Sequence, residues 1–245
     1  MNEPAVAATR ASQTVVFIIS APSGSGKSSL VERILRQDSD RLLFSISYTT
    51  RLPRGEECDG ENYHFISRAD FEARIARGEF LEYAVVFGNY YGTSRRALDQ
   101  AIREGKDLVL DIDVQGARKL KVALPQAITI FVLPPSRKVL EERLRARSQD
   151  SDEVIERRLR GAAEEVRNYK QYDYVLINDD LAECTAQLAA IIEAERFRRI
   201  RMEQAVAPIL ASFEAAETSP VGTVSENGGH PAGKGIKCQN EFETT

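Results

Sequence analysis

Cysteine, histidine and tryptophan are scarce in this chain of 245 residues, which has three cysteines, two histidines and no tryptophan. Cys58, Cys184 and Cys238 lie far apart and form no Cys-x-x-Cys pair, so neither a disulfide framework nor a zinc site is expected. A few scattered cysteines are typical of a protein in a reducing compartment, and we predict a cytoplasmic protein.

Long hydrophobic runs are also missing. The run Val15–Ile19 near the N-terminus is far shorter than the ~18 residues of a membrane span, and the residues before it lack the layout of a signal peptide. Lysine plus arginine number 33 and aspartate plus glutamate 37, which gives a net charge of −4. This balance gives no electrostatic basis for nonspecific binding to nucleic acid or anionic membranes, so neither is an expected partner.

Both ends of the chain are poor in large apolar residues. Residues 1–13 are small and polar, and residues 217–245 hold five of the 15 glycines. Such segments bury too little surface to offset the entropy lost on ordering. We therefore predict that both are disordered.

Between these ends, apolar strands alternate with amphipathic helices. Strands are predicted at residues 15–20, 107–112, 127–133 and 174–177, and helices at 26–37, 94–104, 136–147, 152–170 and 181–210. The alternation indicates an α/β fold in which helices cover both faces of a parallel sheet. The core is assigned to residues 14–42, 94–135 and 171–210.

Residues 43–93 break this alternation. They are richer in aromatic residues and contain the turn signals Asp59-Gly60 and Gly88-Asn89, while Ser67 and Asp70 are spaced as a capping box that opens a helix. We predict a small, mostly antiparallel insert. Residues 136–170 hold two helical patterns rich in both charges, which is typical of solvated helix faces with i,i+4 pairs.

A phosphate-binding loop is predicted between the first strand and the first helix. The segment matches G-x-x-x-x-G-K-[ST] except at its first position, and consists of Ala21, Pro22, Ser23, Gly24, Ser25, Gly26, Lys27, Ser28 and Ser29. Its glycines let backbone N–H groups curl around phosphate oxygens, Lys27 reaches the β- and γ-phosphates, and the Ser28 hydroxyl can bind Mg²⁺. The pattern predicts a site for a nucleoside triphosphate; an ordinary turn before a helix is the alternative.

Two further pairs of residues are candidates for the site of the molecule that accepts the phosphoryl group. Arg51 and Arg54 flank a Leu-Pro step and can fork onto one phosphate, although a solvated loop pair has the same spacing. Asp111 and Asp113 fall on one side of a predicted strand, at the carboxyl end where ligands bind in open α/β sheets. For Asp113 the alternative is a helix N-cap.

Taken together, these motifs resemble bacterial guanylate kinases, which are P-loop nucleoside monophosphate kinases. The resemblance covers residues 14–201 and is carried by the runs SAPSGSGKSS, SISYTTRLPR, GNYYGTS, LDIDVQGA and YDYVLINDDL. It implies a P-loop NTPase-type core, a GMP-binding insert at residues 43–93 and a helical lid at residues 136–170. The glycine that follows Arg54, Gly55, stands one position earlier than is usual in the family.

The resemblance also implies a reaction, ATP + GMP → ADP + GDP with Mg²⁺, a step in GTP and dGTP supply and in GMP recycling. Its site residues would be Arg51, Arg54, Tyr63 and Tyr91 on the GMP phosphate; Ser47, Glu82, Thr93 and Asp113 on guanine; Lys27, Arg143, Arg147 and Arg158 in catalysis; Asn178 on ATP; and Ser28 and, through water, Asp111 on the metal. The chemistry agrees, because guanine N1–H and N2–H₂ need carboxylate acceptors and O6 needs hydroxyl donors.

Two other functions are compatible with parts of this pattern. A phosphopeptide-binding module, as in the guanylate-kinase-like domains of scaffold proteins, would reuse the arginines and tyrosines, but Gly26-Lys27-Ser28 is intact. A kinase of a ribose bisphosphate would keep the P-loop but would not need residues that read guanine. GMP, with dGMP, and ATP are therefore the expected small-molecule partners, and the sequence leaves open a monomer or a homodimer.

Overall fold

The computed structural model describes residues 14–86, 88–147 and 151–217, so both predicted disordered ends lie outside it except for Glu217. Contacts divide the chain into two units, 1–206 and 207–245, and the site described below belongs to the first. No helix in the described ranges is long and apolar enough to cross a membrane.

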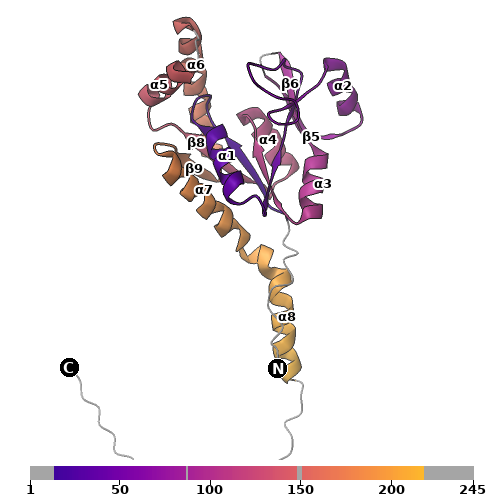
Figure 1. Ribbon diagram of the computed structural model, residues 1–245. Coiled ribbons are helices and arrows are strands. Elements are labelled where there is room, and N and C mark those ends of the chain that lie inside the picture. Colours follow the sequence, from indigo (N-terminus) through magenta and orange to yellow (C-terminus); the bar gives the residue numbers. More distant parts are fainter. Residues whose placement is uncertain (1–13, 87, 148–150, 218–245) are drawn as a thin grey trace, which may run out of the picture. The chain divides into compact units, whose positions relative to one another are not determined.

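A five-stranded parallel sheet forms the core of the first unit (Figure 1). Its strands are, in order, β2 (Leu42–Ser45), β7 (Asp107–Asp111), β1 (Val16–Ser20), β8 (Ile128–Leu133) and β9 (Tyr174–Ile177). The predicted α/β fold is thereby confirmed. The edge strand β2 is a correction, because the sequence places residues 43–45 in the insert whereas they pair with β7. Leu42 and Ser45 are buried and Leu43 and Phe44 are partly buried, and an apolar run of three residues is too short to indicate a strand by itself.

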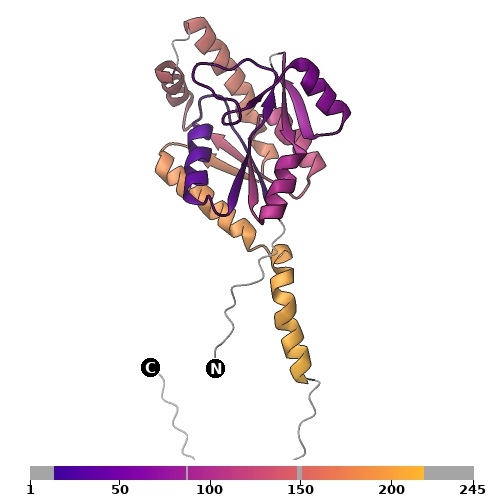
Figure 2. The ribbon, with the colours of Figure 1, turned by 45° about the vertical axis from the view of Figure 1, so that its right-hand side comes forward.

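Helices cover both faces of this sheet (Figure 2). Helices α1 (Lys27–Gln37) and α7 (Leu181–Arg196) pack on one face, and α3 (Arg95–Glu104) and α4 (Val114–Ala123) on the other. Successive side chains of β1 alternate between the two layers, so that Phe17 and Ile19 pack under α1 and Ile18 under α4. Burial on both faces explains why β1 is apolar throughout.

The insert forms a second sheet with the order β4-β3-β6-β5. Its elements are β3 (Tyr48–Thr49), β4 (His64–Phe65), α2 (Arg68–Ala76), β5 (Phe80–Val86) and β6 (Asn89–Ser94). The pairs β3·β6 and β5·β6 are antiparallel and β3·β4 is parallel. The Ser67 hydroxyl accepts a hydrogen bond from the Asp70 N–H, 3.1 Å, which confirms the predicted cap of α2.

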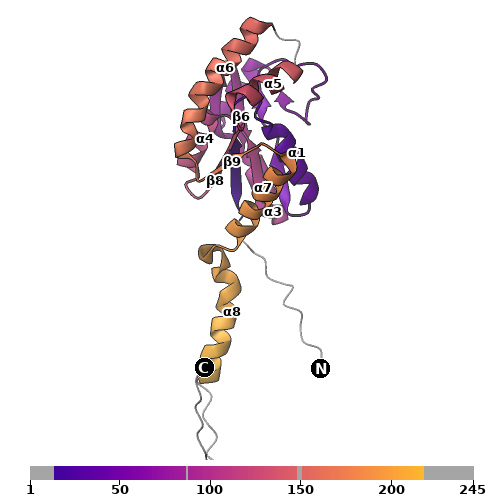
Figure 3. The same ribbon diagram turned by 90° about the vertical axis from the view of Figure 1, so that its left-hand side faces the viewer.

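Two helices lie together beside the sheet, α5 (Arg137–Arg147) and α6 (Asp152–Val166) (Figure 3). They share a small apolar cluster of their own, formed by Leu140, Leu144, Ile155, Leu159 and Ala162. After Val166 the predicted helix tightens to a 3-10 turn at Arg167–Gln171. This cluster packs α5 and α6 against each other separately from the two core layers of the sheet.

The predicted helix over residues 181–210 is in fact two helices, α7 and α8 (Arg199–Glu217). Glu195 is 1% exposed and lies 3.8 Å from the guanidinium of Arg201. Six residues of straight helix would separate these two by about 9 Å along the axis and place them on different faces. The break between Arg196 and Arg199 therefore allows this ion pair, which no local pattern reveals.

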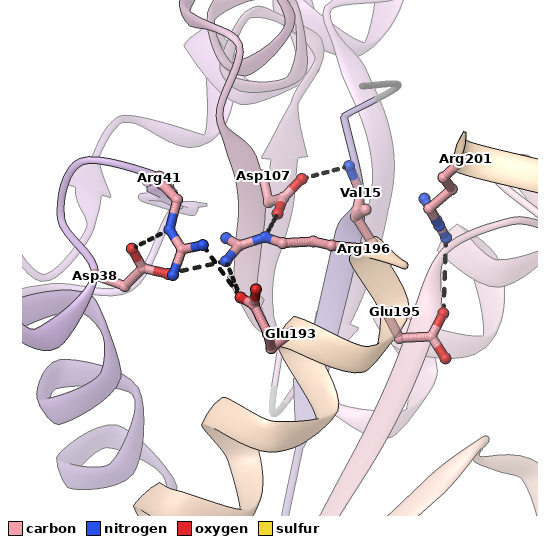
Figure 4. Close-up of polar contacts among 8 residues, drawn as sticks. All are labelled: Val15, Asp38, Arg41, Asp107, Glu193, Glu195, Arg196 and Arg201. Atoms are coloured by element: carbon pink, nitrogen blue, oxygen red, sulfur yellow. Dashed lines mark hydrogen bonds and ion pairs between the residues drawn. The ribbon is translucent and has the colours of Figure 1, made fainter. Parts of the chain in front are cut away.

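A charged network joins the amino-terminal edge of the sheet to α7 (Figure 4). The Arg196 guanidinium donates to Asp107, 2.7 Å, and to Asp38, 3.1 Å. Asp107 in turn accepts from the Val15 N–H, 2.9 Å. Because Arg196 is only 13% exposed, this network holds the starts of β1 and β7 and the end of α1 against α7 in a largely dry setting.

Arg196→Ala is expected to lower the free energy of unfolding by about 3–5 kcal/mol, because it leaves Asp107 and Asp38 without their buried partner. The matched control is Arg199→Ala, whose ion pair with Glu203 is 83% exposed on the arginine side and should cost less than about 1 kcal/mol. Urea unfolding of both variants measures the difference. Equal losses would show that the Arg196 network contributes no more than a surface pair.

Candidate active site

The phosphate loop runs from the carboxyl end of β1 to the first turn of α1. Gly24 and Gly26 have φ of +93° and +86°, a region that residues with a side chain rarely adopt. A Cβ on Gly26 would also lie 2.3 Å from the amide nitrogen of Asn178. The loop therefore requires glycine at position 26 for two independent reasons.

Asn178 lies directly against this loop. It is 3% exposed, and its amide donates to the Ser25 carbonyl, 2.7 Å. This hydrogen bond uses one N–H of the amide, and the amide oxygen has no hydrogen-bond partner among the described residues, so the position on the adenine side of ATP that the resemblance implies stays a prediction. In the structure Asn178 thus shapes the loop, a long-range contact that the sequence does not predict.

Lys27, Ser28 and Asp111 meet at the adjacent carboxyl ends of β1 and β7. Lys27 forms an ion pair with Asp111, and the Ser28 hydroxyl donates to the same carboxylate, 3.4 Å. Burial lowers the pKa of Lys27 to about 8, although the charges of Asp113 and Glu165 oppose this shift. One hydroxyl beside one carboxylate is a donor set that suits Mg²⁺, which keeps several waters and uses few protein oxygens.

A cavity of about 290 Å³ opens between the phosphate loop and the insert. It joins residues from the core, the insert and α6, namely Ala21–Ser28, Ser47, Tyr63, Glu82, Tyr91, Asp111–Val114 and Glu165, with Ala84, Val86 and Gly92. Most residues predicted on the P-loop and around guanine therefore line one cavity. Arg51, Arg54 and Thr93 are not among the lining residues: Arg51 and Thr93 are buried and Arg54 is exposed.

Glu82 is the buried acid of the cavity. It is 7% exposed, and one carboxylate oxygen accepts from the Thr93 hydroxyl, 2.7 Å, while the other has no hydrogen-bond partner among the described residues. Burial raises the pKa of Glu82 to about 7; Asp113 adds to this shift, and Thr93 and Lys119 oppose it. The Thr93 proton, expected on a guanine oxygen, is used here to orient Glu82.

Asp113 caps a helix and also lines the cavity. Its carboxylate accepts from the Gly116 N–H, 2.8 Å, and so caps α4, while the same residue lines the cavity. Capping fixes the side chain at the edge of the cavity. Capping the helix therefore does not prevent Asp113 from lining the cavity.

Arg51 and Arg54 are organised by an acid that the sequence does not single out. The Arg51 guanidinium binds both oxygens of Glu57, 2.8 and 2.9 Å, and lies over the Tyr63 ring at 5.2 Å. Glu57 also accepts from the Arg54 N–H, 2.8 Å. The hydrogen bonds with Glu57 raise the pKa of Arg51 and keep it charged. The position of Glu57 in the arginine loop is the signal that could have identified it.

Two of the three predicted lid arginines already contact the phosphate loop. Arg143 donates to the Ser25 carbonyl, 3.5 Å, and Arg158 to the Ser23 hydroxyl, 2.8 Å. Arg147 ends α5, and its side chain lies outside the described part of the chain. Glu165 of α6 also faces the cavity, and burial raises its pKa. The sequence gives no signal for Glu165, because it is one of several acidic residues in the same helix.

A parallel sheet with a glycine-rich loop at the carboxyl end of a central strand, followed by a lysine in the first helical turn, defines a P-loop nucleotide-binding protein. The sequence model of the family described as Guanylate kinase matches residues 13–195. The chain belongs to the guanylate kinase family.

Individual relatives agree with this placement. A guanylate kinase of Koribacter versatilis is 57% identical over 187 residues, which are 75% of this chain and 80% of the relative. One of Alkalilimnicola ehrlichii is 48% identical over 195 residues, 80% of this chain and 96% of the relative. The crystal structure of guanylate kinase from Anaplasma phagocytophilum has a TM-score of 0.64 and 34% identity, and covers 78% of this chain and 90% of that chain.

Glu82→Gln is expected to stabilise the fold at pH 8 and to change it little at pH 5. The folded wild type keeps a proton on Glu82 that the unfolded chain loses between pH 4.5 and about 7, so its free energy of unfolding falls as the pH rises through that window. The size is on the order of 2–3 kcal/mol. Melting temperatures at both pH values measure it, with the exposed Glu56→Gln as the control. A variant equally stable relative to wild type at pH 5 and 8 would contradict the buried ionisation.

Proposed function

We propose that this protein is a guanylate kinase that transfers the γ-phosphoryl group of ATP to GMP and releases ADP and GDP. The observation that carries the proposal is a single cavity shared by the phosphate loop and by the carboxylates of Glu82 and Asp113. A phosphoryl donor and an acidic base-reading face in one cavity suit a nucleotide acceptor better than a peptide or a sugar phosphate. Membership of the guanylate kinase family supports the same activity.

Guanine would be read by the acidic side of the cavity. The buried Glu82 oxygen that lacks a partner among the described residues can accept from N1–H or N2–H₂, and Asp113 can accept beside it. Ser47 offers a hydroxyl for O6. Adenine would leave the carboxylates unpaired, at a cost of about 1–3 kcal/mol each.

The GMP phosphate would be held at the other end of the acceptor site. Arg51 and Arg54 supply charge, and the hydroxyls of Tyr63 and Tyr91 supply hydrogen bonds; these two rings are 5.9 Å apart. Glu57 prevents Arg51 from swinging freely, so less side-chain entropy is lost when phosphate binds. The insert thus brings a preorganised phosphate site toward the phosphate loop.

The transfer itself needs positioning and charge stabilisation. An ionised oxygen of the GMP phosphate attacks the γ-phosphorus, a new P–O bond forms, and the bond to the β-phosphate oxygen breaks to release ADP. No general base is required, because the attacking oxygen is already deprotonated at neutral pH. Lys27, Arg143, Arg147 and Arg158 neutralise the charge that spreads over the phosphoryl oxygens.

Ser28 and, through water, Asp111 would hold Mg²⁺, the metal that their donor set fits. The ion would supply positive charge beside the phosphates of ATP. Asn178 contributes to the ATP site by holding the loop backbone. We also propose that the protein works in the cytoplasm, in the supply of GTP and dGTP, as a monomer or a homodimer.

Lys27→Ala is expected to lower kcat by at least about 10³-fold and to leave the fold intact, because its loss removes the charge nearest the transferred group. Steady-state ADP release with GMP and ATP measures kcat, and the melting temperature measures the fold. The control is Lys138→Ala, a lysine 86% exposed, which should retain activity. A folded Lys27→Ala variant with near-normal kcat would reject the phosphate-loop assignment.

The choice of base tests the proposed function directly. GMP, and also dGMP, should be phosphorylated, whereas AMP, CMP and UMP should be rejected by a factor of up to about 10⁴. IMP keeps N1–H and O6 but lacks the 2-amino group, so its kcat/KM should be roughly 10- to 100-fold lower than that of GMP.

The Glu82→Gln variant assigns this selectivity to the acidic side of the cavity. Its kcat/KM for GMP should fall sharply, while the KM for ATP should change little because ATP occupies the phosphate loop. Equal use of AMP and GMP by the wild type would refute the proposed function. Unchanged GMP kinetics in the variant would remove Glu82 from base recognition.

A further inference from the structure

Gly116 lies in the first turn of α4, directly against two of the carboxylates that line the cavity, those of Glu82 and Asp113. A Cβ built on it would be 3.1 Å from the free oxygen of Glu82 and 3.2 Å from Asp113 Oδ1. Both distances are shorter than ordinary van der Waals contact. Gly116 does not have the positive φ of the loop glycines, so its backbone does not by itself require glycine.

Neither carboxylate can retreat easily from an added methyl group. On the far side of Glu82 its other oxygen is held at 2.7 Å by the hydroxyl of Thr93, which is fully buried. Asp113 Oδ1 is held at 2.8 Å by the N–H of Gly116 itself. A side chain at position 116 would therefore displace the carboxylates by a few tenths of an ångström.

We propose that Gly116 is a specificity-determining positioning residue: the absence of a side chain there lets Glu82 and Asp113 approach the same point and together face the N1–H and N2–H₂ edge of guanine. The inference rests on the proposed function of the cavity and extends it to a residue that contacts no substrate. Alanine is a better helix former than glycine, so an effect on GMP would not follow from a weaker helix.

The test is the steady-state kinetics of Gly116→Ala. The expected result is a fall in kcat/KM for GMP of about tenfold, mainly through a higher KM, and a smaller preference for GMP over IMP because the 2-amino contact is weakened. The KM for ATP and the melting temperature should not worsen. A parallel loss of ATP binding and thermal stability that Glu82→Ala does not relieve would show a general structural role and overturn the proposal.

Gly161→Ala is the matched control. Gly161 also lies inside a helix, α6, but it is exposed, and a Cβ there would meet no described atom within 4 Å. Its GMP kinetics and its preference for GMP over IMP should equal those of the wild type. The same loss in Gly161→Ala as in Gly116→Ala would mean that any glycine-to-alanine change in a helix has this effect, and would overturn the proposal.

A double-mutant cycle shows whether Gly116 acts through Glu82. Glu82→Ala removes the side chain that the new methyl group would push, so adding Gly116→Ala to it should change kcat/KM for GMP by less than about twofold. If Gly116→Ala alone does not fold, the double variant should fold again. A full tenfold loss in the Glu82→Ala background, or a double variant that stays unfolded, would contradict the inference.

These outcomes are distinct from a failure of the proposed function. A wild type that does not phosphorylate GMP refutes that function itself. An active wild type whose Gly116→Ala variant has unchanged GMP kinetics refutes only the role of Gly116.

Discussion

The alignment of β1 beside β7 is the constraint on which the rest of the site depends. Because the two strands are parallel, Ile19 pairs with Asp111, and the phosphate loop after β1 emerges next to the carboxylates after β7. Lys27 and Ser28 thereby meet Asp111, which lies 83 residues after Ser28 in the chain. The Arg196 network holds the amino-terminal ends of the same two strands. This parallel pair is therefore fixed at both ends of its strands.

Burial of Glu82 in the cavity lowers the stability of the folded protein at neutral pH and gives the cavity a selective hydrogen-bond acceptor. A carboxylate as buried as Glu82 raises the energy of the ionised folded state, which is why its pKa lies near 7. Because the oxygen of Glu82 that faces the cavity is desolvated, a ligand that offers it no hydrogen-bond donor binds at a cost in free energy. Thr93 does not relieve this completely, since it satisfies one oxygen and leaves the other toward the cavity. Buried polar groups of this kind are common where a site must discriminate between similar ligands.

The positive side of the site is organised in a different way. Arg51 is charged, forms an ion pair with Glu57 and packs on an aromatic ring, while Arg143 and Arg158 donate to oxygens of the phosphate loop. Each of these three arginines is therefore held by contacts within the protein. Such contacts reduce the ordering that binding would otherwise require. They also link α5 and α6 to the phosphate loop.

The sequence by itself determined the α/β alternation, the phosphate loop, the cap of α2 and the residue types around the cavity, because apolar periodicity and turn chemistry act within a few residues. Tertiary structure alone decided what depends on distant partners. Strand β2 is an edge strand because it pairs with β7. The predicted helix from residue 181 ends before Arg199, which allows Arg201 to contact Glu195. Asn178 lies directly against Gly26. Glu57, Glu165 and Gly116 gained their positions from neighbours on other elements. Local patterns specify which elements form, whereas packing in three dimensions specifies which side chains face one another.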